Sequence, residues 1–202
     1  ATGVFTHIPM TFREGGRLEA NVSAIIERDN GEILIGTSGH GIFLLNVTEG
    51  HIEAKQLPGF VPSYLINQIY EDRNGTLWVI TNDKGIYSID TNQRMTHYPN
   101  GREIVWPSSI CEDKTGNIYV GCLKNGLFKY NPQTNGFTHI KCSSHPELPI
   151  KTLYNINQDE IYIGTDGNGM KVYNIQKGQI MESPVNITSF NFDKSKVHSI
   201  LK

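Results

Sequence analysis

Aromatic, cationic, amide and acidic side chains recur in the short segments between the apolar runs of this chain. Such a mixture could bind a polar sugar, because charged and amide groups pair with hydroxyls while an aromatic ring covers the apolar ring face. The candidate ligand-binding residues are His40, Tyr64, Lys84, Arg102, Trp106, Lys124, Asn125, Asp166 and Asn168. The alternative interpretation is that each of them is a solvated loop residue.

Two acidic pairs, Glu71-Asp72 and Glu112-Asp113, have the side chains that general acid–base catalysis needs. Both pairs occupy the same place in a repeating pattern, directly before a turn. Repetition at a turn favours carboxylates that accept hydrogen bonds from backbone amides. We therefore expect no catalytic residues in this chain.

The histidines and cysteines do not form a metal-binding pattern. His7, His97 and His139 share one position in different copies of the repeat, and equivalent positions in a radial array diverge. The three cysteines are Cys111, Cys122 and Cys142. The first two take apolar strand positions and are expected to fill the core, while the sequence leaves the redox state of all three open. We expect neither a metal nor a cofactor.

The elements that must position these residues follow from an internal repeat. Each of four copies has a turn residue, an apolar run directly after the turn, and a glycine ten residues after the turn residue. The turn residues are Gly31, Gly75, Gly116 and Asp159, and the later glycines are Gly41, Gly85, Gly126 and Gly169. A period of about 40–45 residues, with four short strands per copy, is that of a β-propeller blade. The sequence therefore predicts an all-β array of four-stranded antiparallel blades.

The apolar positions of the first two strands of each blade predict the core. The second strand is a short continuous apolar run, as expected when both faces of a sheet are covered. We expect burial to be greatest at Ile25, Ile33, Ile35, Ile69, Leu77, Val79, Ile110, Ile118, Val120, Leu153, Ile161 and Ile163. The first strand is expected to lie nearest the propeller axis and the more polar fourth strand outermost.

The repeat divides the chain into four complete blades with a partial blade at each end. We expect residues 18–57, 62–99, 104–141 and 148–183 to form the complete blades. Residues 1–12 match a fourth strand, so they are expected to be the outer strand of a preceding blade. Residues 190–202 match a first strand, so they are expected to be the inner strand of a following blade.

The propeller prediction also places the candidate ligand-binding residues. Loops from the second to the third strand, and loops between blades, emerge on one face around the central channel. Partial blades expose strand edges and apolar faces, which favours self-association or closure by the two end strands. A net charge of −2 without a basic cluster argues against a nucleic-acid partner. No apolar run approaches the roughly 18–20 residues of a membrane span.

Three copies resemble the two-component regulator propeller repeat. They read VSAIIERDNGEILIGTSGHGIFLLN, INQIYEDRNGTLWVITNDKGIYSID and PSSICEDKTGNIYVGCLKNGLFKYN. The family consensus has the form V-x-x-I-x-x-D-x-x-G-x-L-W-I-G-T-x-x-G-G-L-x-x-Y-D. Asp72, Gly75 and Trp78 of the second copy match it, whereas Ile80 and Cys122 depart from it.

The resemblance implies an extracytoplasmic sensor. Propellers of this family form the periplasmic input region of membrane-anchored hybrid two-component histidine kinases of gut Bacteroidetes, where they respond to carbohydrate fragments. The expected function is a ligand-sensing propeller segment in the periplasm, with an oligosaccharide as ligand and no enzymatic activity of its own. The alternatives are a protein-interaction or dimerisation propeller without a small ligand, and a propeller lyase or hydrolase, because fold does not determine function.

Overall fold

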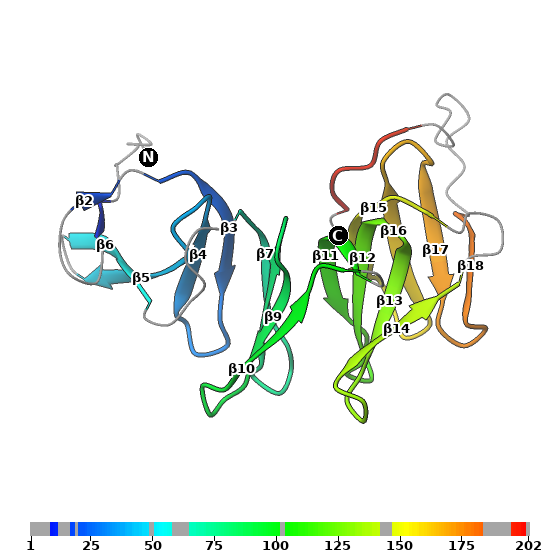
Figure 1. The fold of residues 1–202 in the computed structure, drawn as a ribbon, viewed down its shortest axis with the longest axis horizontal. Coiled ribbons are helices and arrows are strands. Elements are labelled where there is room, and N and C mark those ends of the chain that lie inside the picture. Colours follow the sequence, from blue (N-terminus) through cyan, green and yellow to red (C-terminus); the bar gives the residue numbers. More distant parts are fainter. Residues whose placement is uncertain are drawn as a thin grey trace. The chain divides into compact units, whose positions relative to one another are not determined.

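The fold consists of strands and turns throughout the part of the chain that can be described. The computed structural model describes residues 9–11, 17–18, 20–48, 51–57, 65–101, 104–141, 147–183 and 195–200. Every regular element among these residues is a β-strand (Figure 1). The chain divides into two compact units, Ala1–Ile69 and Tyr70–Lys202, and the boundary falls within one strand. The all-β prediction is confirmed.

The first unit contains a six-stranded sheet in the order β2-β1-β6-β5-β4-β3. Its strands are β1 (Met10–Thr11), β2 (Arg17–Leu18), β3 (Val22–Glu27), β4 (Ile33–Thr37), β5 (Ile42–Thr48) and β6 (His51–Gln56). Strands β3 to β6 pair antiparallel in chain order and form blade 1. Strand β1 pairs parallel to β6, so Met10 and Thr11 join blade 1 rather than a preceding blade. Residues 1–8 of the predicted preceding strand lie outside the described residues.

Three further sheets have four antiparallel strands each, and we call them blades 2, 3 and 4. Blade 2 contains β7 (Ile66–Glu71), β8 (Leu77–Thr81), β9 (Gly85–Ile89) and β10 (Met95–Pro99). Blade 3 contains β11 (Val105–Glu112), β12 (Ile118–Lys124), β13 (Gly126–Asn131) and β14 (Gly136–Ile140). Blade 4 contains β15 (Ile150–Asn155), β16 (Glu160–Thr165), β17 (Met170–Asn174) and β18 (Gln179–Glu182). In each blade the strands are hydrogen-bonded in chain order, as the repeat predicts.

Strand β12 shows why the second strand of a blade is apolar in its middle. Val120 and Cys122 pack in one core cluster with Ile80 of blade 2. Tyr119, which points to the opposite face, packs in a second cluster with Ile163 of blade 4. Because alternate side chains of a strand point to opposite faces, a strand covered on both sides needs no polar positions.

Burial follows the prediction except in β3 and at the start of β4. The predicted core positions that are buried are Ile35, Ile69, Leu77, Val79, Ile110, Ile118, Val120, Leu153, Ile161 and Ile163. The prediction is wrong at Ile25, which is 68% exposed, and Ile33 is only half-buried. The equivalent Ile110 and Leu153 pack against the blade that precedes them in the chain. Among the described residues no sheet covers this face of β3.

The aspartates of the acidic pairs cap the turn between the first and second strands. Asp72 Oδ1 accepts hydrogen bonds from the backbone N–H groups of residues 74 and 76, at 2.9 and 3.0 Å. Asp113 Oδ1 accepts from the corresponding N–H groups of residues 115 and 117. The other oxygen of each carboxylate accepts from a buried aromatic side chain, the Trp78 indole or the Tyr119 hydroxyl. The interpretation as amide caps is confirmed.

The preceding glutamate of the second pair has a different role, since it ties two blades together. Glu112 of blade 3 accepts a hydrogen bond from Arg73 Nε at 2.5 Å and another from the Tyr70 hydroxyl at 3.4 Å. The Arg73 guanidinium also donates to the carbonyl oxygens of Asp113 and Lys114. One arginine in the turn of blade 2 therefore reaches across to three residues of the next blade.

A threonine and a glycine close the turn between the second and third strands. The Oγ1 atoms of Thr37, Thr81 and Thr165 donate to the carbonyl oxygens of the glycines four residues later, at 2.6–2.8 Å. All three threonines are fully buried. Cys122 takes this position in blade 3. The fixed spacing of threonine and glycine therefore reflects one buried hydrogen bond in each of blades 1, 2 and 4.

Residues 195–200 lie against blade 4 as the first strand of a further blade would. The N–H of Val197 donates to Thr165 O at 2.9 Å, and Lys196 forms a bridge with Asp166. A Cβ added to Gly164 would lie 2.8 Å from Val197, just as one added to Gly36 would lie 2.7 Å from Ile66. The other residues of the predicted segment 190–202 lie outside the described part.

Two cysteines fill core positions as predicted. Cys111 is 7% exposed and Cys122 is fully buried. Burial raises the pKa of the Cys111 thiol well above its ordinary value and that of Cys122 to about 12. Neither thiol therefore has the character of a nucleophile. Cys142 lies outside the described residues.

Aspartate substitutions at equivalent positions of β3 and β11 test whether one face of β3 is left uncovered. Ile110 and Ile25 hold the same position in their blades, yet Ile110 is 1% exposed and Ile25 is 68% exposed. Ile110→Asp should lower the free energy of unfolding by about 3 kcal/mol or more, because it buries a charge. Ile25→Asp should change it by less than about 0.5 kcal/mol. Urea unfolding measures both, and equal losses would show that this face of β3 is covered.

The capped turn of blade 3 predicts acid-sensitive stability. Burial opposes ionisation of Asp113, but hydrogen bonds from Asn117 and Thr115 outweigh it and lower the pKa from 3.8. Because the pKa is lower in the folded state, the stabilisation is present above about pH 4 and is lost as the pH falls further. Asp113→Asn should therefore flatten the acid branch of the curve of unfolding free energy against pH. An unchanged acid branch would contradict this role of the carboxylate.

Candidate functional site

The loop face of blades 2 and 3 brings several predicted site residues together. Val105 pairs with Lys124 at the ends of β11 and β12, which places Trp106 beside the turn after β12. Lys124 Nζ lies 4.6 Å from the centroid of the Trp106 ring, within cation–π range. Asn125 forms the turn with a φ of 71°. These three residues form a contiguous group on one surface, which we call the loop-face cluster.

Trp106 has a backbone conformation that is unusual for its residue type. Its φ is 54°, in the left-handed region that side chains with a Cβ seldom adopt. The ring is 44% exposed, so burial does not explain the conformation. The Oδ1 atom of Asn100 accepts a hydrogen bond from the Trp106 N–H at 3.1 Å. A strained, exposed aromatic residue held by a neighbouring side chain makes this surface a candidate binding site.

Asn100 was not predicted, although it links Lys84 to the loop-face cluster. The backbone N–H of Asn100 donates to Lys84 O at 3.2 Å. Its side-chain amide donates to Asp83 O, while Oδ1 holds Trp106. The sequence signal was available, because Asn100-Gly101 is a dipeptide typical of tight turns.

The remaining predicted residues lie elsewhere or outside the described part. Asp166 forms ion pairs with Lys196 at 3.0 Å and Lys151 at 3.8 Å. The hydrogen bond from Lys196 lowers the pKa of Asp166, and Lys151 adds to this effect. Asn168 donates its N–H to Thr165 in the β16–β17 turn, and His40 belongs to the first unit. Tyr64 and Arg102 lie outside the described residues.

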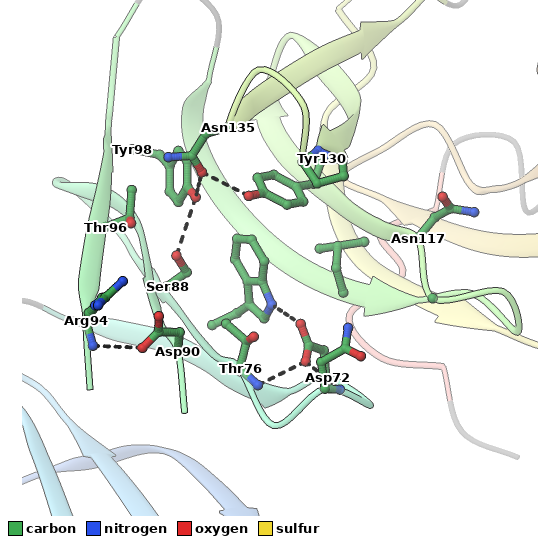
Figure 2. A pocket seen from close by; sticks show the side chains of 15 residues that line it. Asp72, Thr76, Ser88, Asp90, Arg94, Thr96, Tyr98, Asn117, Tyr130 and Asn135 are labelled. Atoms are coloured by element: carbon green, nitrogen blue, oxygen red, sulfur yellow. Dashed lines mark hydrogen bonds between the residues drawn. The ribbon is translucent and has the colours of Figure 1, made fainter. Parts of the chain in front are cut away.

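A second candidate site was not predicted at all. A pocket of about 390 Å³ lies between the outer parts of blades 2 and 3 within the second unit (Figure 2). Blade 2 contributes Trp78, Ser88, Tyr98 and the turn residues around Asp90. Blade 3 contributes the side chains of Asn117, Ile118, Tyr130 and Asn135. We call it the inter-blade pocket.

Shared hydrogen bonds organise one wall of the inter-blade pocket. The hydroxyls of Tyr98 and Tyr130 both donate to Asn135 Oδ1, at 2.7 and 2.9 Å. The Ser88 and Tyr98 hydroxyls lie 3.4 Å apart (Figure 2). Because Tyr98 donates its proton to Asn135, Ser88 is the donor in this second hydrogen bond. Burial raises the pKa of Tyr130, and the hydrogen bond with Tyr98 adds to the rise. Tyr130 therefore stays neutral, and the hydrogen bonds of the two hydroxyls to Asn135 join the two blades.

Aromatic rings form the floor of the same pocket. Trp78 packs edge-on against Tyr130, with ring centroids 4.9 Å apart, and stacks with Tyr98 at 6.0 Å. Asp72 fixes the indole through its Nε1, as in the capped turn described above. Trp78 is 3% exposed and Tyr98 is 8% exposed, so the floor is rigid and already desolvated. A floor of this kind offers ring edges and a few oriented polar atoms to a ligand.

The polar rim of the pocket comes from one turn of blade 2. Asp90 Oδ1 accepts from the N–H groups of Asn92 and Arg94, both at 2.9 Å. Its Oδ2 has no partner among the described residues, and neither does the Arg94 guanidinium. The hydroxyl of Thr96 lines the same side. A carboxylate, a guanidinium and a hydroxyl therefore remain available to a bound molecule.

The carboxylates beside the candidate sites have structural roles in the turns of blades 2 and 3. The capping aspartates are engaged by backbone amides and aromatic side chains. The described residues contain no group of three or more histidine, cysteine or acidic side chains that could hold a metal ion. They also contain no helix able to cross a membrane.

The sequence itself matches one family at the start of blade 2. Residues 61–83 match the family described as Two component regulator propeller. The chain carries the two-component regulator propeller repeat. The match covers the capping Asp72, the turn Gly75 and the buried Trp78. No curated protein sequence matches the chain.

Solved structures share the fold of the repeat array. The extracellular domain of a hybrid two-component system from B. thetaiotaomicron aligns with a TM-score of 0.71 and 23% identity, over 97% of this chain and 27% of its own. A second such domain from B. thetaiotaomicron gives 0.63 and 17%, over 85% and 25%. Virginiamycin B lyase from Staphylococcus aureus gives 0.66 and 15%, over 84% and 57%. The chain thus spans about a quarter of the length of the extracellular domains.

Proposed function

We propose that this chain is a segment of an extracytoplasmic sensor propeller in a two-component system, that it binds carbohydrate, and that it catalyses no reaction. The two-component regulator propeller repeat carries this proposal. The similarity in fold to extracellular domains of hybrid two-component systems supports a location outside the cytoplasm, in the periplasm for a membrane-anchored protein. The polar and aromatic surfaces of the second unit supply the binding capacity that a sensor requires.

The loop-face cluster favours carbohydrate over other small ligands. The Trp106 ring is exposed and fixed in position, so it offers an apolar surface at low entropic cost. Lys124 lies over the ring, and Asn125 extends the polar edge. An oligosaccharide presents an apolar ring face and several hydroxyls, which match this arrangement. The array as a whole then contributes a rigid platform rather than a catalytic centre.

An interaction propeller is the second candidate function. Val22 is 51% exposed and Ile25 is 68% exposed on β3, and such apolar exposure favours a protein partner, including a second copy of this chain. Light scattering separates the two functions, because a scaffold would self-associate without saccharide binding.

The similarity to a lyase is one of fold alone at 15% identity.

Calorimetric titration with neutral and acidic oligosaccharides tests the carbohydrate proposal. At least one saccharide should bind at the loop-face cluster with a Kd of about 1 mM or tighter, and Trp106→Ala should weaken binding at that site about tenfold. Ile156→Ala is the matched control, because Ile156 is 39% exposed in a turn of blade 4. Absence of binding by every saccharide would contradict the proposal.

A further inference from the structure

The inter-blade pocket has the chemistry of a second binding site, distinct from the loop-face cluster. It lies at the turns between β7 and β8 and between β9 and β10, whereas the loop-face cluster lies at the opposite ends of the strands. Its volume of about 390 Å³ is at the lower end of the range for small-molecule pockets. Its floor is aromatic and its rim is polar, which is the usual composition of a ligand site.

We propose that the inter-blade pocket binds one or two rings of a neutral saccharide. This inference rests on the proposed carbohydrate-sensing function and assigns it a site that both blades complete. Asp90 Oδ2 accepts hydrogen bonds from sugar hydroxyls, and the Arg94 guanidinium donates two parallel hydrogen bonds to neighbouring hydroxyl oxygens. The edges of Trp78 and Tyr130 contact the apolar C–H groups of the ring.

The charges at the rim exclude acidic sugars. Asp72 and Asp90 place two carboxylates at the pocket against the single guanidinium of Arg94. A uronate or a sulfated sugar would add a third negative charge beside them, and like charges in a partly desolvated site repel strongly. A neutral pyranose avoids this cost and still satisfies the carboxylate oxygen of Asp90.

A second hollow of about 390 Å³ adjoins the inter-blade pocket. The two hollows share Asn117, Tyr130 and Pro132. Lys129, Gln133 and Thr138 supply polar atoms there. A disaccharide with its first ring in the inter-blade pocket can therefore extend its second ring into the adjoining hollow.

The equivalent turns of blades 3 and 4 show which substitutions leave the turn of blade 2 intact. Asp90 corresponds to Asn131 of blade 3, whose Oδ1 also accepts from turn N–H groups, at 2.9 and 3.4 Å. Asp90→Asn therefore retains the turn and removes the negative charge. Arg94 is exposed, so Arg94→Ala removes the guanidinium without opening the core. Lys177→Ala is the control, because Lys177 is an exposed cation in the corresponding turn of blade 4.

The experiment is calorimetry on the full 202-residue chain with glucose, galactose, xylose, lactose and cellobiose, and with glucuronate as the acidic probe. At least one neutral saccharide should bind. Arg94→Ala and Asp90→Asn should each weaken its binding about tenfold, because each removes a hydrogen bond to a charged group. Lys177→Ala should leave it unchanged, and glucuronate should not compete.

The other outcomes separate this inference from the proposed function. Neutral-saccharide binding that Trp106→Ala abolishes and Arg94→Ala spares would overturn the inter-blade site but retain a carbohydrate sensor. Binding of glucuronate without binding of any neutral saccharide would also overturn the inter-blade site and retain a carbohydrate sensor. If no saccharide binds, neutral or acidic, both the site and the proposed function fail. Thermal unfolding of each variant verifies that a loss of binding is not a loss of fold.

Discussion

The second unit depends on one constraint, which is that the second strand of a blade must be covered on both faces. In β12 alternate side chains enter two separate core clusters, one toward blade 2 and one toward blade 4. No polar position is left in the middle of the strand, so neither neighbour can be removed without exposing apolar surface. The turns, caps and cross-blade contacts then fix how closely successive sheets approach. A pocket between blades exists only where this packing leaves room at the outer edge.

Most of the fold could be predicted because the repeat records the same local interactions in each copy. Asp72 and Asp113 accept from the same turn amides, and the buried threonines close the same later turn. The prediction was wrong at Ile25, because burial depends on a neighbouring sheet and not on the strand that carries the residue. The parallel pairing of β1 with β6 has no counterpart in the repeat, so spacing could not reveal it.

The binding surfaces could be predicted only in part, since they depend on departures from the repeat. Trp106 and Lys124 were predicted in loops, whereas the structure places them at the ends of β11 and β12. The left-handed conformation of Trp106 and the support from Asn100 are tertiary features. The inter-blade pocket depends on Tyr98 and Asn135, which lie 37 positions apart and meet only when two blades pack. The spacing of the repeat carries no signal that the turns near residues 90 and 135 face each other.

Amide hydrogen exchange tests the central claim most directly, namely that a saccharide binds between blades 2 and 3. The full chain is compared with and without the tightest-binding neutral saccharide at saturation. The account predicts slower exchange in residues 90–98 and 130–136 on the two sides of the pocket, with residues 195–200 unchanged. Slower exchange confined to residues 100–106 and 124–126, or no change anywhere, would contradict it.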